Sequence, residues 1–117
     1  MGQDQTVEAR LARLQTVADS LLDAEGDLPR EMRAAAFAHA SAVAGRPVPG
    51  AAPLPEPLGG FVAKVTAQAY RIGDADVDAL RQAGYSDDAI LEAVLSTAVG
   101  AGLSRLEIGL NAIAGSR

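Results

Sequence analysis

The sequence predicts an all-α protein, and three observations lead to that prediction. Apolar residues recur at steps of three and four positions through most of the chain, which is the spacing of an amphipathic helix. Glycines, prolines and capping residues interrupt this pattern and divide it into about five segments of helical length. No segment shows the alternation of apolar and polar residues that is typical of a strand. We therefore expect about five helices and no sheet.

The length and composition fit one domain with a core of its own. The chain has 117 residues, of which 49% are hydrophobic and 21% are charged, as in ordinary globular proteins. We expect a single all-helical domain, made of an N-terminal helical pair over residues 1–45, a Pro-rich connector over 46–57 and a helical core over 58–117.

The N-terminal pair consists of helices expected over residues 4–23 and 29–45. The apolar stripe of the first helix is formed by Val7, Leu11, Leu14, Val17, Leu21 and Leu22. Gly26 ends this helix, and Pro29 is well placed in the first turn of the second. The second helix is rich in alanine, which predicts close contact with another helix rather than a core of bulky side chains.

The segment between the two halves is dense in proline. Five of the six prolines fall between Pro47 and Pro57. Each proline removes an amide donor and biases the residue before it toward an extended backbone, so we expect neither a helix nor a central strand there. The sequence predicts an extended connector on the surface.

Two shorter helices are expected after the connector, over residues 58–72 and 74–83. The apolar side of the first is formed by Leu58, Val62, Val65, Ala69 and Ile72. Gly73 ends that helix, Asp74 is expected to cap the next one, and Gly84 ends it.

A long helix is expected over residues 87–114, on the order of 40 Å if unbroken. Ser86 is placed to cap it, and acidic residues follow in its first turn. Two adjacent apolar rows run along it, and they are wider than one neighbouring helix can cover, so this is either the central helix of the domain or an oligomer contact. Glycines at 100, 102 and 109 lower helix propensity and predict close approach by a neighbouring backbone. The oligomer interface is expected at Ala98, Gly102, Leu103, Leu106, Gly109 and Leu110.

The composition excludes several kinds of chemistry. Cysteine is absent, so this chain alone forms no disulfide, thiolate metal site or catalytic thiol, and a single histidine leaves no His-cluster metal site. We expect no metal and no cofactor. A net charge of −5 and an aromatic content of 3% argue against nucleic acid and anionic membranes as partners. No signal-peptide pattern and no uncharged apolar run of about 18 residues occur, so we expect a cytoplasmic protein.

Candidate catalytic residues are few. His39 lies mid-helix among alanines, where it is either a general acid or base or an ordinary side chain at the edge of the core. Tyr70 and Arg71 lie near the end of the helix over 58–72, where they either bind an anion or cover the rim of the core.

Two segments of the second half carry a family resemblance. Residues 75–94 read ADVDALRQAGYSDDAILEAV, and residues 96–107 read STAVGAGLSRLE. Together they resemble the carboxymuconolactone decarboxylase family, which includes the alkylhydroperoxidase D-like proteins, and the similarity extends over about residues 69–110. The resemblance implies an all-helical domain that assembles into trimers or hexamers through its long helix. Nine arginines to one lysine fit a GC-rich bacterial genome.

Redox members of that family carry a Cys-x-x-Cys-x-x-x-His motif before an Ala-Gly turn. Counted back from the turn, these positions fall on Ala69, Ile72 and Asp76, none of which can do thiol chemistry. The family's upstream glutamate falls on Pro57, with Glu56 one position away. The resemblance therefore implies a divergent member, and we expect no thiol peroxidase activity.

Three functional interpretations remain open from the sequence. The favoured one is a non-catalytic helical subunit that acts through self-association or through a catalytic relative. The alternative is a cysteine-free acid–base enzyme, of decarboxylase or isomerase type, on a small organic acid. Its only candidate catalytic residues are His39, Glu56, Tyr70 and Arg71. The third is a small-ligand binding or regulatory module. An enzyme would need a concave site where these side chains meet.

Overall fold

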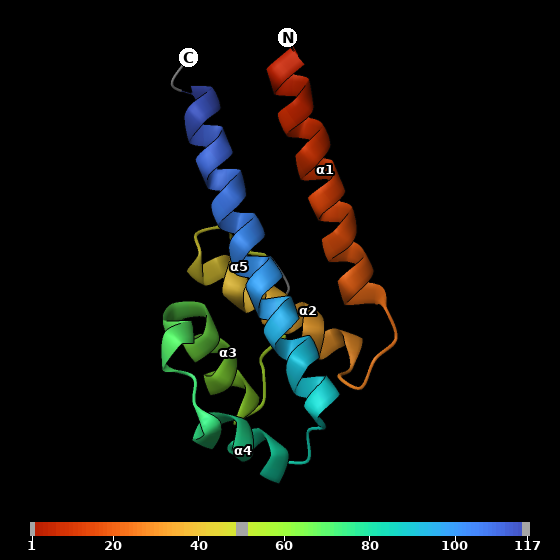
Figure 1. Ribbon diagram of the computed structural model, residues 1–117, viewed down its shortest axis with the longest axis vertical. Helices are drawn as coiled ribbons and strands as arrows, with labels where there is room; N and C mark the ends of the chain where they lie inside the picture. Colours follow the sequence, from red (N-terminus) through yellow and green to blue (C-terminus); the bar gives the residue numbers. More distant parts are fainter. Residues whose placement is uncertain (1, 49–51, 116–117) are drawn as a thin grey trace.

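Helices account for all of the regular secondary structure in the part of the chain that the computed structural model describes, residues 2–48 and 52–115 (Figure 1). The elements in chain order are α1 (Gly2–Asp23), α2 (Arg30–Val43), α3 (Leu58–Gln68), the 3-10 helix η1 (Ala69–Arg71), α4 (Asp74–Gln82) and α5 (Asp87–Gly115). The prediction of an all-α fold with about five helices is confirmed. The connector expected over 46–57 lies partly outside the described residues, at 49–51.

The helix ends depart from prediction in two places. The helix expected over 58–72 leaves α-helical geometry at Gln68, whose φ is −147°, and continues as η1. Gly73, rather than Asp74, is the N-cap of α4. Glycine has no side chain to cap with, and instead Asp76 accepts a hydrogen bond from the Gly73 amide at 2.9 Å.

The centre of the fold is the crossing of α2 and α5, which form by far the most extensive helix pair (Figure 1). A Cβ built on Gly100 would lie 3.0 Å from two backbone atoms of Phe37 and closer still to its carbonyl oxygen. The buried side chains of α2 are mostly small: Arg33, Ala35, Ala36, Ala38, Ala40 and Ser41. The close helix contact predicted from the alanines is therefore confirmed.

The apolar core lies where α3 and α4 pack against the first half of α5 and against α2. Its buried members are Leu28, Ala36, Leu58, Phe61, Val62, Leu80, Ala89, Ile90 and Ala93. Since α5 contacts each of the other four α-helices, it is the central helix of the domain.

Polar contacts hold the turn between α1 and α2 in place. The buried guanidinium of Arg33 donates to the carbonyl oxygens of Leu21, at 2.8 Å, and Ala24 at the end of α1. On the other side, the Glu92 carboxylate of α5 accepts hydrogen bonds from the amides of Asp27, at 3.1 Å, and Leu28, at 2.7 Å. Free carbonyl groups at the end of α1 are thereby bound by a side chain of α2, and free amides before α2 by a side chain of α5.

The molecule is elongated, with extents of 53 × 28 × 25 Å. The start of α1 and the end of α5 project beyond the rest of the fold as two neighbouring helical arms (Figure 1). The radius of gyration is 15.4 Å, whereas a compact domain of this length has about 13.4 Å. The chain on its own therefore exposes more surface than its size requires.

Candidate functional site

The four candidate catalytic residues do not form one site. His39 is exposed on α2. Glu56 lies just before α3, whereas Tyr70 and Arg71 follow its last residue. An 11-residue helix separates these two positions, a distance of about 16 Å. Among residues 2–48 and 52–115, no hydrogen bond or ion pair joins a histidine or a glutamate to the Tyr70–Arg71 pair.

Local contacts explain three of these residues. The Glu56 carboxylate accepts a hydrogen bond from the Gly60 amide at 3.1 Å, which satisfies one of the free donors at the start of α3. The Tyr70 side chain is 81% exposed, and the Arg71 guanidinium lies 5.8 Å from its ring centroid, within cation–π range. These contacts are sufficient without a ligand.

Two of the three residues that the resemblance aligns with a redox motif, Ile72 and Asp76, have contacts that stabilise the fold. Ala69 is exposed in η1, and Ile72 packs against the core. Both carboxylate oxygens of Asp76 accept hydrogen bonds from Lys64, at 2.9 and 3.0 Å, and so tie α3 to α4. The hydrogen bond from the Gly73 amide, and to a smaller extent the one from Lys64, lowers the pKa of Asp76 below its ordinary value of 3.8. This side chain is therefore an anion at neutral pH.

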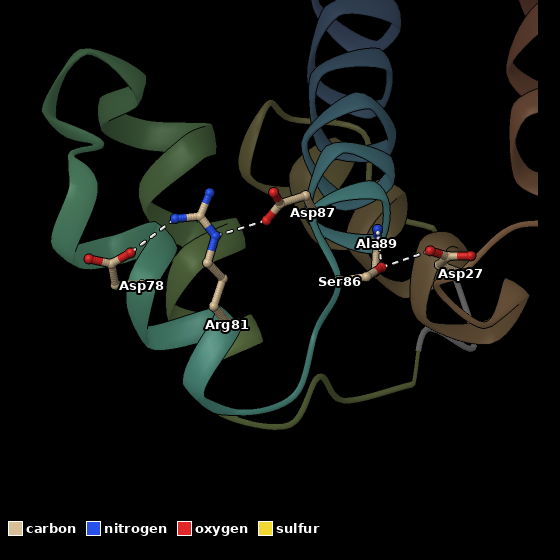
Figure 2. A network of polar contacts seen from close by, with 6 residues as sticks. All are labelled: Asp27, Asp78, Arg81, Ser86, Asp87 and Ala89. Carbon is tan, nitrogen blue, oxygen red and sulfur yellow. Dashed lines mark hydrogen bonds and ion pairs between the residues drawn. The ribbon is translucent and has the colours of Figure 1, made fainter.

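A polar network fixes the junction between α4 and α5 (Figure 2). Arg81 donates to Asp87 at 2.8 Å and to Asp78 at 3.0 Å, and these two carboxylates, Asp87 first, raise the pKa of the guanidinium. Ser86 caps α5 as predicted, since its hydroxyl accepts from the Ala89 amide at 3.1 Å. The same hydroxyl donates to Asp27 at 2.8 Å, which links the cap to the turn before α2.

A cavity of about 300 Å³ lies between α1, the end of α2 and α5. Its lining residues are Gln15, Phe37, Ser41, Arg46, Pro47, Val48, Gly100, Leu103, Ser104 and Glu107. Phe37 and Leu103 supply apolar surface. The volume is at the lower end of the range for small-molecule sites.

Two of the lining residues, Arg46 and Glu107, form an ion pair. Arg46 Nη2 lies 3.0 Å from Glu107 Oε2, and both side chains are partly exposed. The loop that carries Arg46 is fixed to α2, because the Ser41 hydroxyl donates to the Arg46 carbonyl oxygen at 2.6 Å. The Ser104 hydroxyl of α5 in turn donates to the Ser41 carbonyl oxygen at 3.3 Å.

Sequence reasoning missed this cavity. Its residues come from three helices and from the loop after α2, at spacings that match no motif. The only signal in the sequence was the position of Arg46 at the start of the Pro-rich segment.

The side of α5 that faces away from α2 is largely apolar and exposed, with the charged residues Asp88 and Arg105 at its edges. We call it the outer face of α5; it consists of Leu91, Leu95, Ala98, Gly102, Leu106 and Gly109, all exposed. These positions share one side of the helix because they are spaced by three, four or seven residues. Leu91 is 54% exposed and Leu95 is 42% exposed.

The residues expected at an oligomer interface fall into two groups. Ala98, Gly102, Leu106 and Gly109 belong to the outer face of α5. Leu103, by contrast, is 8% exposed and packs within its own subunit, so it has little area to offer a second one. Leu110 is half-buried. Nothing lies within 4 Å of a Cβ built on Gly102 or Gly109, so of the three α5 glycines expected to meet a neighbouring backbone, Gly100 alone does so within the subunit.

Two further observations concern the described residues as a whole. Residues 2–48 and 52–115 contain no cluster of three or more acidic or histidine side chains able to hold a metal ion. By length and composition alone, Asp87–Ile113 in α5 is apolar enough to cross a membrane, and half of that window is buried within the fold.

Comparison with known proteins finds no matching family model, no similar curated protein and no similar solved structure. The family resemblance therefore rests on the residues over 69–110 alone.

Proposed function

We propose that this chain is a non-catalytic helical subunit that acts through assembly, and that copies of the chain meet through the outer face of α5. The observation that carries this proposal is the face itself. Four exposed apolar side chains and two exposed glycines lie along it. A soluble monomer rarely leaves such a continuous apolar surface in water.

The exposed area supports a second copy as the partner. The chain exposes 7087 Å², whereas a compact monomer of its mass of 11.9 kDa exposes about 5,900 Å². The excess is about 1,200 Å², and a stable interface buries about 800 Å² on each partner. Closed symmetric assembly of identical chains is the commonest way to cover such a surface.

The face also has the shape and charge for helix packing. Ala98, Gly102 and Gly109 leave room for another helix to approach closely, while the leucines supply apolar area. Acidic Asp87 and Asp88 stand at the start of α5, and the chain has a net charge of −5. Helices that bind at membrane surfaces carry basic residues instead. We therefore favour a protein partner over a lipid surface.

The family resemblance is consistent with this role. It implies trimers or hexamers with the long helix in the contacts, and the residues at its redox positions, Ala69, Ile72 and Asp76, lack thiol chemistry. We propose a carboxymuconolactone decarboxylase-like, cytoplasmic subunit without redox activity. Among the described residues no contact favours the acid–base enzyme over this interpretation, since neither His39 nor Glu56 contacts the Tyr70–Arg71 pair.

The test uses one charge at the centre of the face. Gly102 has open space around it and lies inside a helix, so Gly102→Glu leaves the subunit fold intact and adds helix propensity. Asn111→Glu is the matched control, because Asn111 is exposed nine residues further along α5, half a turn away from the face. Light scattering at micromolar concentration gives the molar mass of each protein.

We expect a multiple of 11.9 kDa for the unmodified chain and for Asn111→Glu, and a folded monomer for Gly102→Glu. An unmodified chain that is monomeric would overturn the proposal. If that monomer also bound neutral phosphatidylcholine vesicles, the partner of this face would be lipid and not a second copy of the chain. An oligomer that Gly102→Glu leaves unchanged would place the contact elsewhere and overturn the role of this face.

A further inference from the structure

We propose that the cavity between α1, α2 and α5 binds a small apolar amino acid as its zwitterion. The cavity is lined by apolar side chains and by a cation and an anion side by side. It lies on the side of α5 opposite to the outer face, since Gly100 lines it and Gly109 is half a turn away. Ligand binding here is therefore independent of the assembly proposed above.

The interior of the cavity suits a short apolar side chain. Phe37, Val48 and Leu103 contribute apolar surface, and Gly100 contributes no side chain. The volume of about 300 Å³ limits the ligand to a small molecule, because sites for larger ligands extend to about 1,000 Å³. Leu103 is buried and Phe37 half-buried, so these walls are held by the fold.

The ion pair supplies both halves of a recognition group. Arg46 and Glu107 are joined by one contact between Nη2 and Oε2. The remaining guanidinium donors and the second carboxylate oxygen have no partner among the described residues. They are free to bind a carboxylate and an ammonium group, respectively. An exposed ion pair of this kind is worth little by itself, so it opens to a ligand at small cost.

Charge decides which ligand class fits. A simple carboxylic acid would pair with Arg46 but place its anion beside Glu107. A simple amine would pair with Glu107 but place its cation beside Arg46. A zwitterion satisfies both groups at once and brings no net charge. The geometry therefore points to an α-amino acid with an apolar side chain, such as leucine.

The experiment is a titration followed by amide NMR of the full chain, with L-leucine as the probe. N-acetyl-L-leucine, which lacks the ammonium group, and L-leucinamide, which lacks the carboxylate, are the comparison ligands. We expect saturable shifts at the amides of Gly100 and Ser104 with L-leucine at about 10 mM, where a millimolar Kd gives near saturation. Both derivatives should bind at least about tenfold more weakly, because each loses a charge-assisted contact.

Variants assign the effect to the ion pair. Arg46→Gln and Glu107→Gln should each weaken L-leucine binding by about tenfold. Arg105→Gln is the control, since Arg105 is exposed on α5 and does not line the cavity. The absence of saturable shifts at Gly100 and Ser104 would overturn the proposal. The proposal would also be overturned if either leucine derivative bound as tightly as L-leucine, or if both Arg46→Gln and Glu107→Gln bound L-leucine as tightly as the unmodified chain.

Discussion

Gly100→Ala probes the closest helix contact in the fold. The added methyl group would lie 3.0 Å from two backbone atoms of Phe37, whereas carbon atoms pack at about 3.5–4.0 Å. To accept it, α2 and α5 must move apart by about 0.5–1 Å. No flexible side chain can yield instead, because the obstacle is backbone.

The magnitude follows from two opposing effects. Overpacking a tight contact costs about 1–3 kcal/mol, and replacing glycine with alanine inside a helix returns about 1 kcal/mol. We expect a net loss of up to about 2 kcal/mol for Gly100→Ala. Gly102→Ala is the matched control, because its methyl group meets nothing within 4 Å of the subunit. That variant should gain up to about 1 kcal/mol.

Thermal unfolding followed by circular dichroism measures the difference. For a chain of this length, 1 kcal/mol corresponds to about 4 °C in Tm. The two variants differ by the overpacking cost of about 1–3 kcal/mol, so their Tm values should differ by about 4–12 °C. Both are compared as monomers, at a protein concentration at which light scattering gives 11.9 kDa, because Gly102 lies on the proposed contact face and association raises the apparent Tm. Equal Tm values for the two variants would refute the close packing of α2 on α5.

Three other changes test separate parts of the structure. Ser96→Ala should stabilise the protein by about 1–2 kcal/mol in urea titrations, because the buried Ser96 hydroxyl has no hydrogen-bond partner; a loss of stability would contradict this. Asp76→Asn should lower Tm at pH 7, since Gly73 and Lys64 bind the carboxylate. Because the folded pKa lies below 3.8, this stabilisation is present above that pH and is lost as the pH falls through the folded pKa. The two Tm values should therefore converge once the pH is below the folded pKa. Leu103→Asp should reduce the helical signal in circular dichroism, since Leu103 is buried within its subunit; a folded monomer would instead place Leu103 between subunits.

Local signals in the sequence predicted most of the fold. The cap at Ser86 was predictable because a hydroxyl followed by acidic residues matches a helix start. The helix ends at Gly45 and Gly84 were predictable because glycine tolerates the positive φ with which helices often end. In the structure these two residues have φ values of 105° and 100°. The sequence could not predict which glycine of α5 contacts the backbone of another helix, because that depends on how α5 is rotated against α2.

The candidate site depends on tertiary structure that the sequence does not display. His39 and Glu56 looked suitable by residue type, but the fold leaves one exposed and uses the other to cap α3. Arg46 and Glu107 are 61 residues apart in the chain. Their pairing follows from the crossing of α2 and α5, which no local pattern specifies.

The most direct test of the central claim is whether the outer face of α5 becomes covered when copies of the chain meet. The chain has no cysteine, so Ala98→Cys introduces a single thiol on that face, and Asn111→Cys provides one on the opposite side of the helix. The measurement is the rate of maleimide labelling over a range of protein concentrations. We predict that labelling of the thiol at position 98 slows as the concentration rises, while labelling at position 111 does not change. A rate at position 98 that is independent of concentration, in samples that light scattering shows to be monomeric at every concentration, would contradict the account.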